Sequence, residues 1–292
     1  MKALGKAGAE ATLRAANTLV LAALLPLAAC APLPEQKPVA LTQTNEQGCT
    51  RQRSVGPQDA FADPAPVKQA CVGPYLLALP QNYFDNQTGT EHDGSFALAL
   101  EYPSLQPFKP GELKQFNVDV FARTVSINYG FIDRIDVQQA LRNAYTPMDF
   151  EQDDPARSLH LRKQGEIIHG LSPYYADIDR IRAYRRKQGM DETAPGMQVR
   201  WHRDWYVARD DHDEIQTIIK CTAQGVTETG VAYRDGRLVR SRESELPECD
   251  HFFIVADHST RIRVTYVRAA LKDWRAIEKR ARDLLVGSIA RK

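Results

Sequence analysis

Alternation of apolar and polar residues through the body of the chain predicts antiparallel β-strands. In the segment SFALALEYP, Phe96, Leu98, Leu100 and Tyr102 fall on one side, as in a strand with a single buried face. Similar alternation, or a short apolar run bounded by polar residues, predicts strands at residues 75–79, 116–122, 125–129, 205–208, 214–220, 251–255 and 261–267.

Local turn and cap signals add a hairpin and a helix. Asp235-Gly236 separates two short apolar segments, which is a strong signal for a two-residue β-hairpin. Ser172-Pro173 precedes an apolar periodicity that stops at Gly189, so we expect a helix capped by Ser172.

The last part of the chain predicts an amphipathic C-terminal helix. Its apolar stripe consists of Leu271, Trp274, Ile277, Ala281, Leu284 and Leu285. Because Glu278 and Asp283 interrupt the basic residues on its other side, we expect the stripe to face a sheet and not a membrane. A shorter helix is predicted at residues 137–144.

These elements predict an α+β protein made of two sub-domains, each with helices on one face of an antiparallel sheet. We place the N-terminal sub-domain at residues 71–170 and the C-terminal sub-domain at residues 171–292. No internal repeat is evident.

Residues 1–29 have the organisation of a secretory signal peptide. Three basic residues and one acidic residue precede an apolar run that is too short to span a bilayer. The run ends in Leu27-Ala28-Ala29-Cys30, which resembles the lipobox of bacterial lipoproteins. This resemblance implies that Cys30 is lipidated and becomes the first mature residue. The residue after Cys30 is Ala31 and not aspartate, which resembles lipoproteins that are sorted to the outer membrane.

Residues 30–70 are expected to be the lipid anchor and a proline-rich tether. They contain six prolines after the anchor and few large apolar residues, so we expect too little buried surface to offset the chain entropy. Folded structure is therefore expected from Cys71 onward.

The remaining cysteines are even in number, and an exported chain reaches an oxidising compartment. Cys49, Cys71, Cys221 and Cys249 allow three connectivities, and free thiols or a zinc site are further possibilities. We expect the local pairs Cys49–Cys71 and Cys221–Cys249, because each closes a modest loop within one half of the chain.

Charge and motifs exclude several function classes. The net charge is +1, and −1 without residues 1–29, with no basic run of the kind that nucleic-acid binding requires. No glycine-rich phosphate loop or H-E-x-x-H motif occurs, and Gly170-Leu171-Ser172 lacks the second glycine of a nucleophile elbow. We therefore expect no catalytic residues, no metal and no cofactor, and a protein that binds and does not catalyse.

Binding to another protein needs exposed anchors. The acidic run Asp210, Asp211, Asp213 and Glu214 is expected to lie in a solvated hairpin loop, where it offers a contact surface for a basic partner. Tyr174 and Tyr175 are candidate aromatic anchors of the same interface.

The stretches CVGPYLLALPQNYF, FALALEYPSLQPF, CDHFF and RVTYVRAALKDWRAIEKRARDLLVGS resemble the Tli immunity lipoproteins, which are encoded beside type VI secretion lipase effectors. The resemblance implies an outer-membrane lipoprotein that faces the periplasm and inhibits a secreted phospholipase by binding it. A non-catalytic structural or assembly lipoprotein of the envelope is the main alternative, followed by a small-ligand sensor or an enzyme with an unfamiliar site.

Overall fold

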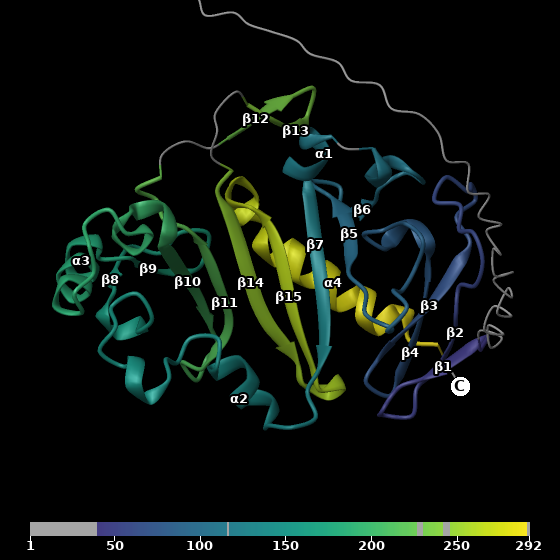
Figure 1. The fold of residues 1–292 in the computed structure, drawn as a ribbon, viewed down its shortest axis with the longest axis horizontal. Helices are drawn as coiled ribbons and strands as arrows, with labels where there is room; N and C mark the ends of the chain where they lie inside the picture. Colours follow the sequence, from purple (N-terminus) through teal and green to yellow (C-terminus); the bar gives the residue numbers. More distant parts are fainter. Residues whose placement is uncertain (1–39, 116, 227–229, 242–245, 291–292) are drawn as a thin grey trace, which may run out of the picture. The chain divides into compact units, whose positions relative to one another are not determined.

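One antiparallel sheet of nine strands organises the part of the chain that the computed structural model describes, residues 40–115, 117–226, 230–241 and 246–290 (Figure 1). In spatial order its strands are β6 (Gln106–Pro107), β5 (Leu98–Glu101), β7 (Thr124–Phe131), β15 (Thr260–Val267), β14 (Glu248–Val255), β11 (Ile215–Thr222), β10 (Arg203–Arg209), β9 (Ser172–Tyr175) and β8 (Lys163–Gln164). The signal peptide and Cys30 lie outside the described residues.

The α+β fold class is confirmed, but the sheet crosses the boundary that we expected near residue 170. Strand β7 from the first half pairs with β15 from the second, with Ile127 opposite Val264. Strand β7 also pairs with β5, and β15 with β14, so in two separate sheets each would have been an edge strand with unpaired backbone groups. Their pairing removes those edges, and the described residues belong to one compact unit, Val39–Lys292.

The predicted C-terminal helix is present as α4 (Trp274–Ser288), which follows a 3-10 segment at Arg268–Asp273. It crosses behind β14, β15 and β7 in Figure 1, and its apolar stripe is buried in the main core. Facing it from the sheet are the inward side chains Ile127, Ile219, Phe253 and Val264, all with no exposed surface. The prediction that this helix packs on a sheet is therefore confirmed.

Three hairpins and three short helices complete the described structure. The hairpins are β1 (Thr42–Thr44) with β2 (Thr50–Gln52), β3 (Val67–Val72) with β4 (Tyr75–Pro80), and β12 (Val231–Arg234) with β13 (Arg237–Arg240). The helices are α1 (Val118–Ala122), α2 (Val137–Arg142) and α3 (Ile178–Lys187). At the β12–β13 turn, Asp235 and Gly236 both have positive φ, so the predicted two-residue hairpin is confirmed.

Part of the expected tether is folded, which corrects the start that we placed at Cys71. Strands β1 and β2 lie within the expected tether, and β3 begins in it. Cys49 is buried. The Arg51 guanidinium is also buried and donates to the Gln43 side chain and to the Glu91 carbonyl. The reason is covalent as well as polar: Cys49 is joined to Cys71. The second predicted pair, Cys221–Cys249, joins adjacent strands β11 and β14.

Two local assignments were wrong because a cap lies elsewhere. The strand expected at residues 116–122 is helix α1, whose first turn is capped by Asn117 through the Asp119 N–H. The helix expected from Ser172 begins only at Ile178, capped by Asp177, and Ser172-Pro173 belongs to strand β9. The backbone hydrogen bonds of the segment before the cap are made to strand β10, and sequence periodicity did not reveal this pairing.

Candidate functional site

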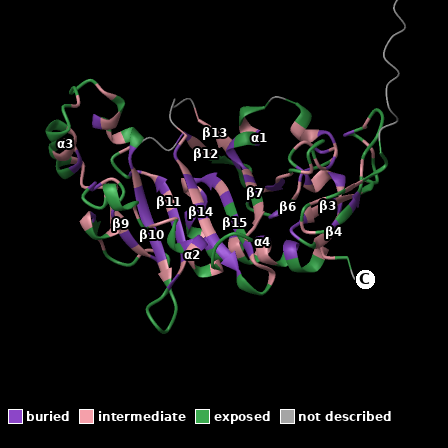
Figure 2. Cartoon of the chain, turned by 60° about the horizontal axis from the view of Figure 1, so that its bottom comes forward, coloured by how far each residue is buried: buried purple, intermediate pink, exposed green. Residues whose placement is uncertain are grey.

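The two faces of the sheet differ sharply in chemistry. One cross-strand row, Tyr206, Ile219, His251, Val264 and Ile127, is buried on the side of α4. The neighbouring row points to the opposite face and consists of Tyr174, Trp205, Lys220, Asp250, Thr265 and Ser126. Figure 2 shows buried and less buried residues alternating along these strands. The second face carries a smaller apolar cluster around Ile218, which α2 partly covers, beside the polar residues of this row.

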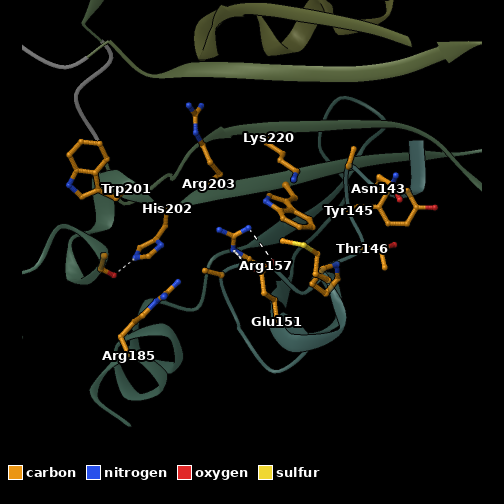
Figure 3. Close-up of a pocket in the computed structure, with 16 residues that line it drawn as sticks. Asn143, Tyr145, Thr146, Glu151, Arg157, Arg185, Trp201, His202, Arg203 and Lys220 are labelled. Atoms are coloured by element: carbon orange, nitrogen blue, oxygen red, sulfur yellow. Dashed lines mark hydrogen bonds and ion pairs between the residues drawn. The ribbon is translucent and has the colours of Figure 1, made fainter. Parts of the chain in front are cut away.

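A cavity of about 430 Å³ lies at the β10–β11 end of this second face (Figure 3). Strands β10 and β11 contribute Arg203, Trp205 and Lys220, and the segment after α2 contributes Tyr145 and Met148. The remaining lining includes Glu151, Arg157, Arg185, Trp201 and His202. Four cations and one carboxylate therefore surround the same space.

Two cationic side chains lie over the ring of Trp205. The Arg162 guanidinium and the Lys220 ammonium each lie 4.1 Å from the centroid of the Trp205 ring, within the range of cation–π attraction. Arg162 is held there by hydrogen bonds to the carbonyls of Arg203 and Ala156. Burial lowers the pKa of Arg162 to about 10, so this side chain remains a cation at neutral pH.

Lys220 is the cavity cation that makes no close ion pair among the described residues. Burial lowers the pKa of Lys220 to about 8, and the nearby Arg162 charge adds to the shift. Asp250 lies directly opposite on β14, but its carboxylate accepts from Arg263 at 2.8 Å and from Thr265 at 3.1 Å. Within the described residues, the half-buried Lys220 ammonium makes no hydrogen bond and no close ion pair, and Asp250 acts on it only at longer range.

The other cations of the cavity are paired. Arg157 lies 3.2 Å from Glu151, Arg185 lies 2.9 Å from Asp154, and Arg203 lies 3.8 Å from Asp250. The cavity's positive charge therefore comes mainly from Lys220, and secondarily from paired arginines that are themselves partly exposed.

The solvent-exposed part of the cavity lining includes two large apolar side chains beside polar and charged ones. The Trp201 residue is 62% exposed and Met148 is 56% exposed, although both are large apolar side chains. Exposed tryptophan and arginine side chains around a partly desolvated pocket are typical of protein-binding hot spots. His202 points its Nε2 at the Gly196 carbonyl at 3.0 Å, and burial lowers the pKa of its imidazole. The arrangement is suited to binding an anionic group that has an apolar stem.

The predicted acidic contact residues lie in the β10–β11 turn, as expected for a hairpin loop. The Asp210 carboxylate accepts the backbone N–H groups of His212 and Glu214, which makes it part of the turn itself. Asp213 lies 3.6 Å from Arg209, and Asp211 is exposed. A role of this loop in partner binding remains a prediction.

Tyr174 and Tyr175 do not form one patch, because adjacent residues of strand β9 point to opposite faces. Tyr174 packs beside Trp205 and, with Tyr145 and Arg209, lines a second cavity of about 400 Å³. Tyr175 packs edge-on against Tyr206 on the side of the main core. Only Tyr174 therefore lies near the basic cavity.

Sequence reasoning missed the cavity residues Lys220, Arg203 and Trp205 as a group. The alternation along β11 did contain a signal. Ile219 and Cys221 point into the main core, so Lys220 between them must point to the opposite face of the sheet. The partners from residues 145–162 had no such signal, since only the folded chain brings them to β10 and β11.

A second polar cluster lies beneath α4 and resembles an acid–base pair. Glu278 accepts from His251 at 3.0 Å, from Thr217 at 2.7 Å and from Arg282 at 2.7 Å. His251 has no exposed surface, and Tyr266 lies 3.3 Å from its other ring nitrogen. A substrate has no route to this imidazole, so the cluster ties α4 to the sheet.

The described residues contain no group of three or more histidine, cysteine, aspartate or glutamate side chains placed to hold a metal ion. No helix in the described ranges is long and apolar enough to cross a membrane.

Comparisons with known proteins yield one informative likeness. No protein-family model matches the chain, and no curated protein matches it. The fold is similar to a solved structure of Smlt3025, an immunity protein of the Stenotrophomonas maltophilia type IV secretion system. The TM-score is 0.65 and the sequence identity is 24% over 87% of this chain and 100% of that chain. This chain therefore has the fold of that protein over the other protein's whole length.

Proposed function

We propose that the protein is an immunity protein that binds a secreted antibacterial effector and blocks its activity. The observation that carries the proposal is the fold likeness to Smlt3025, which covers all of that chain. The sequence resemblance to immunity lipoproteins supports the same role by a separate route.

The surface of the molecule is consistent with binding. The basic cavity, with two exposed apolar side chains in its lining, supplies a charged pocket and large side chains in one place. Specific protein complexes commonly bury roughly 800 Å² on each partner around such anchors. We infer that the effector contacts the face of the sheet opposite α4, including this cavity.

We further propose that the effector is a phospholipase and that the protein is an outer-membrane lipoprotein facing the periplasm. This finer proposal rests on the resemblance to the Tli group and on the lipobox-like end of the leader at Cys30. The resemblance points to type VI delivery, whereas the solved neighbour belongs to a type IV system. An inhibitor meets the effector only after delivery, so its binding surface does not depend on which machine is used.

Co-expression tests the immunity role. The mature chain, solubilised from the envelope with detergent, is used to recover binding proteins, which are identified by mass spectrometry. A recovered protein is then targeted to the periplasm of a host cell, with or without the full-length chain. We expect killing without the chain and growth with it.

Continued killing despite good expression of the chain would falsify the immunity role. Loss of phospholipid in the killed cells, measured by lipid analysis, tests the lipase class separately. Killing that the chain prevents without any change in phospholipid would retain the immunity role and reject the lipase.

A further inference from the structure

Resting on the proposed function, we propose that the basic cavity receives the carboxylate of an acidic side chain from the effector, with Lys220 as the main partner of that carboxylate. The ammonium group, the Trp205 ring and the exposed apolar side chains of the lining together make a socket for an anion on an apolar stem.

The charge balance of the cavity favours an incoming anion. Lys220 faces Arg162, Arg157 and Arg203 as cations, and Asp250 is the nearest acidic residue on the neighbouring strand. The Asp250 carboxylate favours the charged form of Lys220, but it also accepts from Arg263 and Thr265 and is outnumbered by the three arginines. A half-buried cation without a close counterion gains more from a partner's carboxylate than an exposed cation does.

Because the other cations are already paired, the socket favours a ligand with a single negative charge. Arg157 and Arg185 keep their own carboxylates, Glu151 and Asp154, in the free protein. A single carboxylate needs only the free ammonium, whereas a doubly charged phosphate would favour breaking one of these pairs. The exposed apolar side chains of Trp201 and Met148 also suit the methylene stem of glutamate or aspartate.

A bound carboxylate would favour the charged form of Lys220. Since the free ammonium loses its proton near neutral to mildly basic pH, tight binding at basic pH requires proton uptake. Affinity for the effector should therefore fall between about pH 7 and about pH 9, by roughly tenfold or less.

Three variants test the proposal in the complex with the recovered effector. Lys220→Met removes the charge, and we expect a rise in Kd of roughly tenfold to a hundredfold. Lys220→Arg keeps a charge that does not titrate, so it should retain most of the affinity and lose the pH dependence. Lys272→Met is the matched control, because Lys272 also lies over an aromatic ring, 5.7 Å from the centre of Tyr233, away from the cavity. Its Kd should stay within about twofold of wild type.

Small probes test the chemistry without the effector. The pKa of Lys220 is followed by NMR in the presence of the α-methylamide of N-acetyl-glutamate or of inorganic phosphate. We expect the glutamate derivative to raise this pKa and phosphate to raise it less. A larger effect of phosphate would overturn the carboxylate assignment.

The remaining outcomes separate this inference from the immunity role. If the effector is neutralised but Lys220→Met binds it like wild type, the carboxylate socket is rejected and the immunity role stands. If no recovered protein is neutralised, the immunity role itself fails. Thermal melting shows that the variants fold, and removing a desolvated charge at Lys220 should not lower the midpoint.

Discussion

At the scale of single residues, the two faces of the sheet differ in how they pair their charged groups. Glu278 on α4 accepts hydrogen bonds from His251 on β14, Thr217 on β11 and Arg282 on α4 itself, which offset the cost of burying its charge. Lys220 on the other face lies over Trp205 and makes no close ion pair among the described residues. A satisfied buried group stabilises the fold, whereas an unsatisfied one at a cavity is a candidate for binding a partner.

The Glu278 cluster makes stability depend on pH. Burial lowers the pKa of His251 below its ordinary value of 6.5, outweighing the hydrogen bond to Glu278. Although burial opposes ionisation of Glu278, the donors around it, led by His251, hold the pKa of Glu278 below 4.5. In each case the unfolded chain binds the proton first. Stability is therefore present above the unfolded pKa and is lost as the pH falls, first through the range of His251 and then through that of Glu278.

We expect the free energy of unfolding, measured with urea, to decrease between about pH 7 and about pH 5. Glu278→Gln should lower it by about 3 kcal/mol at neutral pH, because it removes one partner of a buried network. His212→Gln is the control, since His212 is exposed in the β10–β11 turn. A flat pH profile, or an equal loss in the control, would show that the cluster does not stabilise α4.

At the scale of elements, the fold depends on pairings between distant segments. Strand β7 pairs with β15, and α4 lies across both halves of the sheet. The end of α4 also meets the β3–β4 hairpin, where Leu77 pairs with Ile289. Helix α4 therefore holds the β3–β4 hairpin to the sheet as well as covering the core.

Two adjacent residues of α4 test how much its buried stripe contributes. Leu285 has no exposed surface, whereas the Val286 residue next to it is 51% exposed. Leu285→Ala should lower the free energy of unfolding by about 3 kcal/mol, and Val286→Ala by less than about 0.5 kcal/mol. Chemical denaturation measures both. Similar losses in the two variants would mean that α4 contributes through helix propensity and not through packing.

At the scale of the whole molecule, the proposed role joins a folded body to a membrane anchor. The described body carries its distinctive cavity on the face away from α4, and the proposed lipid would be attached at Cys30, outside the described residues. Two or more acyl chains are needed for stable anchoring, which the lipoprotein modification would supply at a single residue.

Removing the proposed anchor should change location without changing the fold. In a Cys30→Ser variant we expect loss of palmitate labelling and release from the membrane fraction, with the thermal midpoint of the body unchanged. Fractionation and metabolic labelling measure the first two. A variant that still labels with palmitate and stays with the membranes would exclude Cys30 as the anchor.

The sequence by itself determined the structural features that depend on residues close together in the chain. Strand alternation predicted most of the central strands, helical periodicity predicted α4, and Asp235-Gly236 predicted the β12–β13 turn. The local disulfide pairs were also predicted correctly from loop length. These features follow from backbone periodicity and short loops, which are visible without tertiary contacts.

Only the tertiary structure decided how the segments are combined. Whether β7 and β15 form two edges or one pair depends on partners 129 to 139 residues apart in the chain, from Thr260–Phe131 to Thr265–Ser126. The meeting of Lys220 and Trp205 with side chains from residues 145–203 likewise has no local signature. Long-range pairing is set by burial of complementary surfaces, so the single sheet, the folded start of the expected tether and the basic cavity emerge only when the whole chain packs.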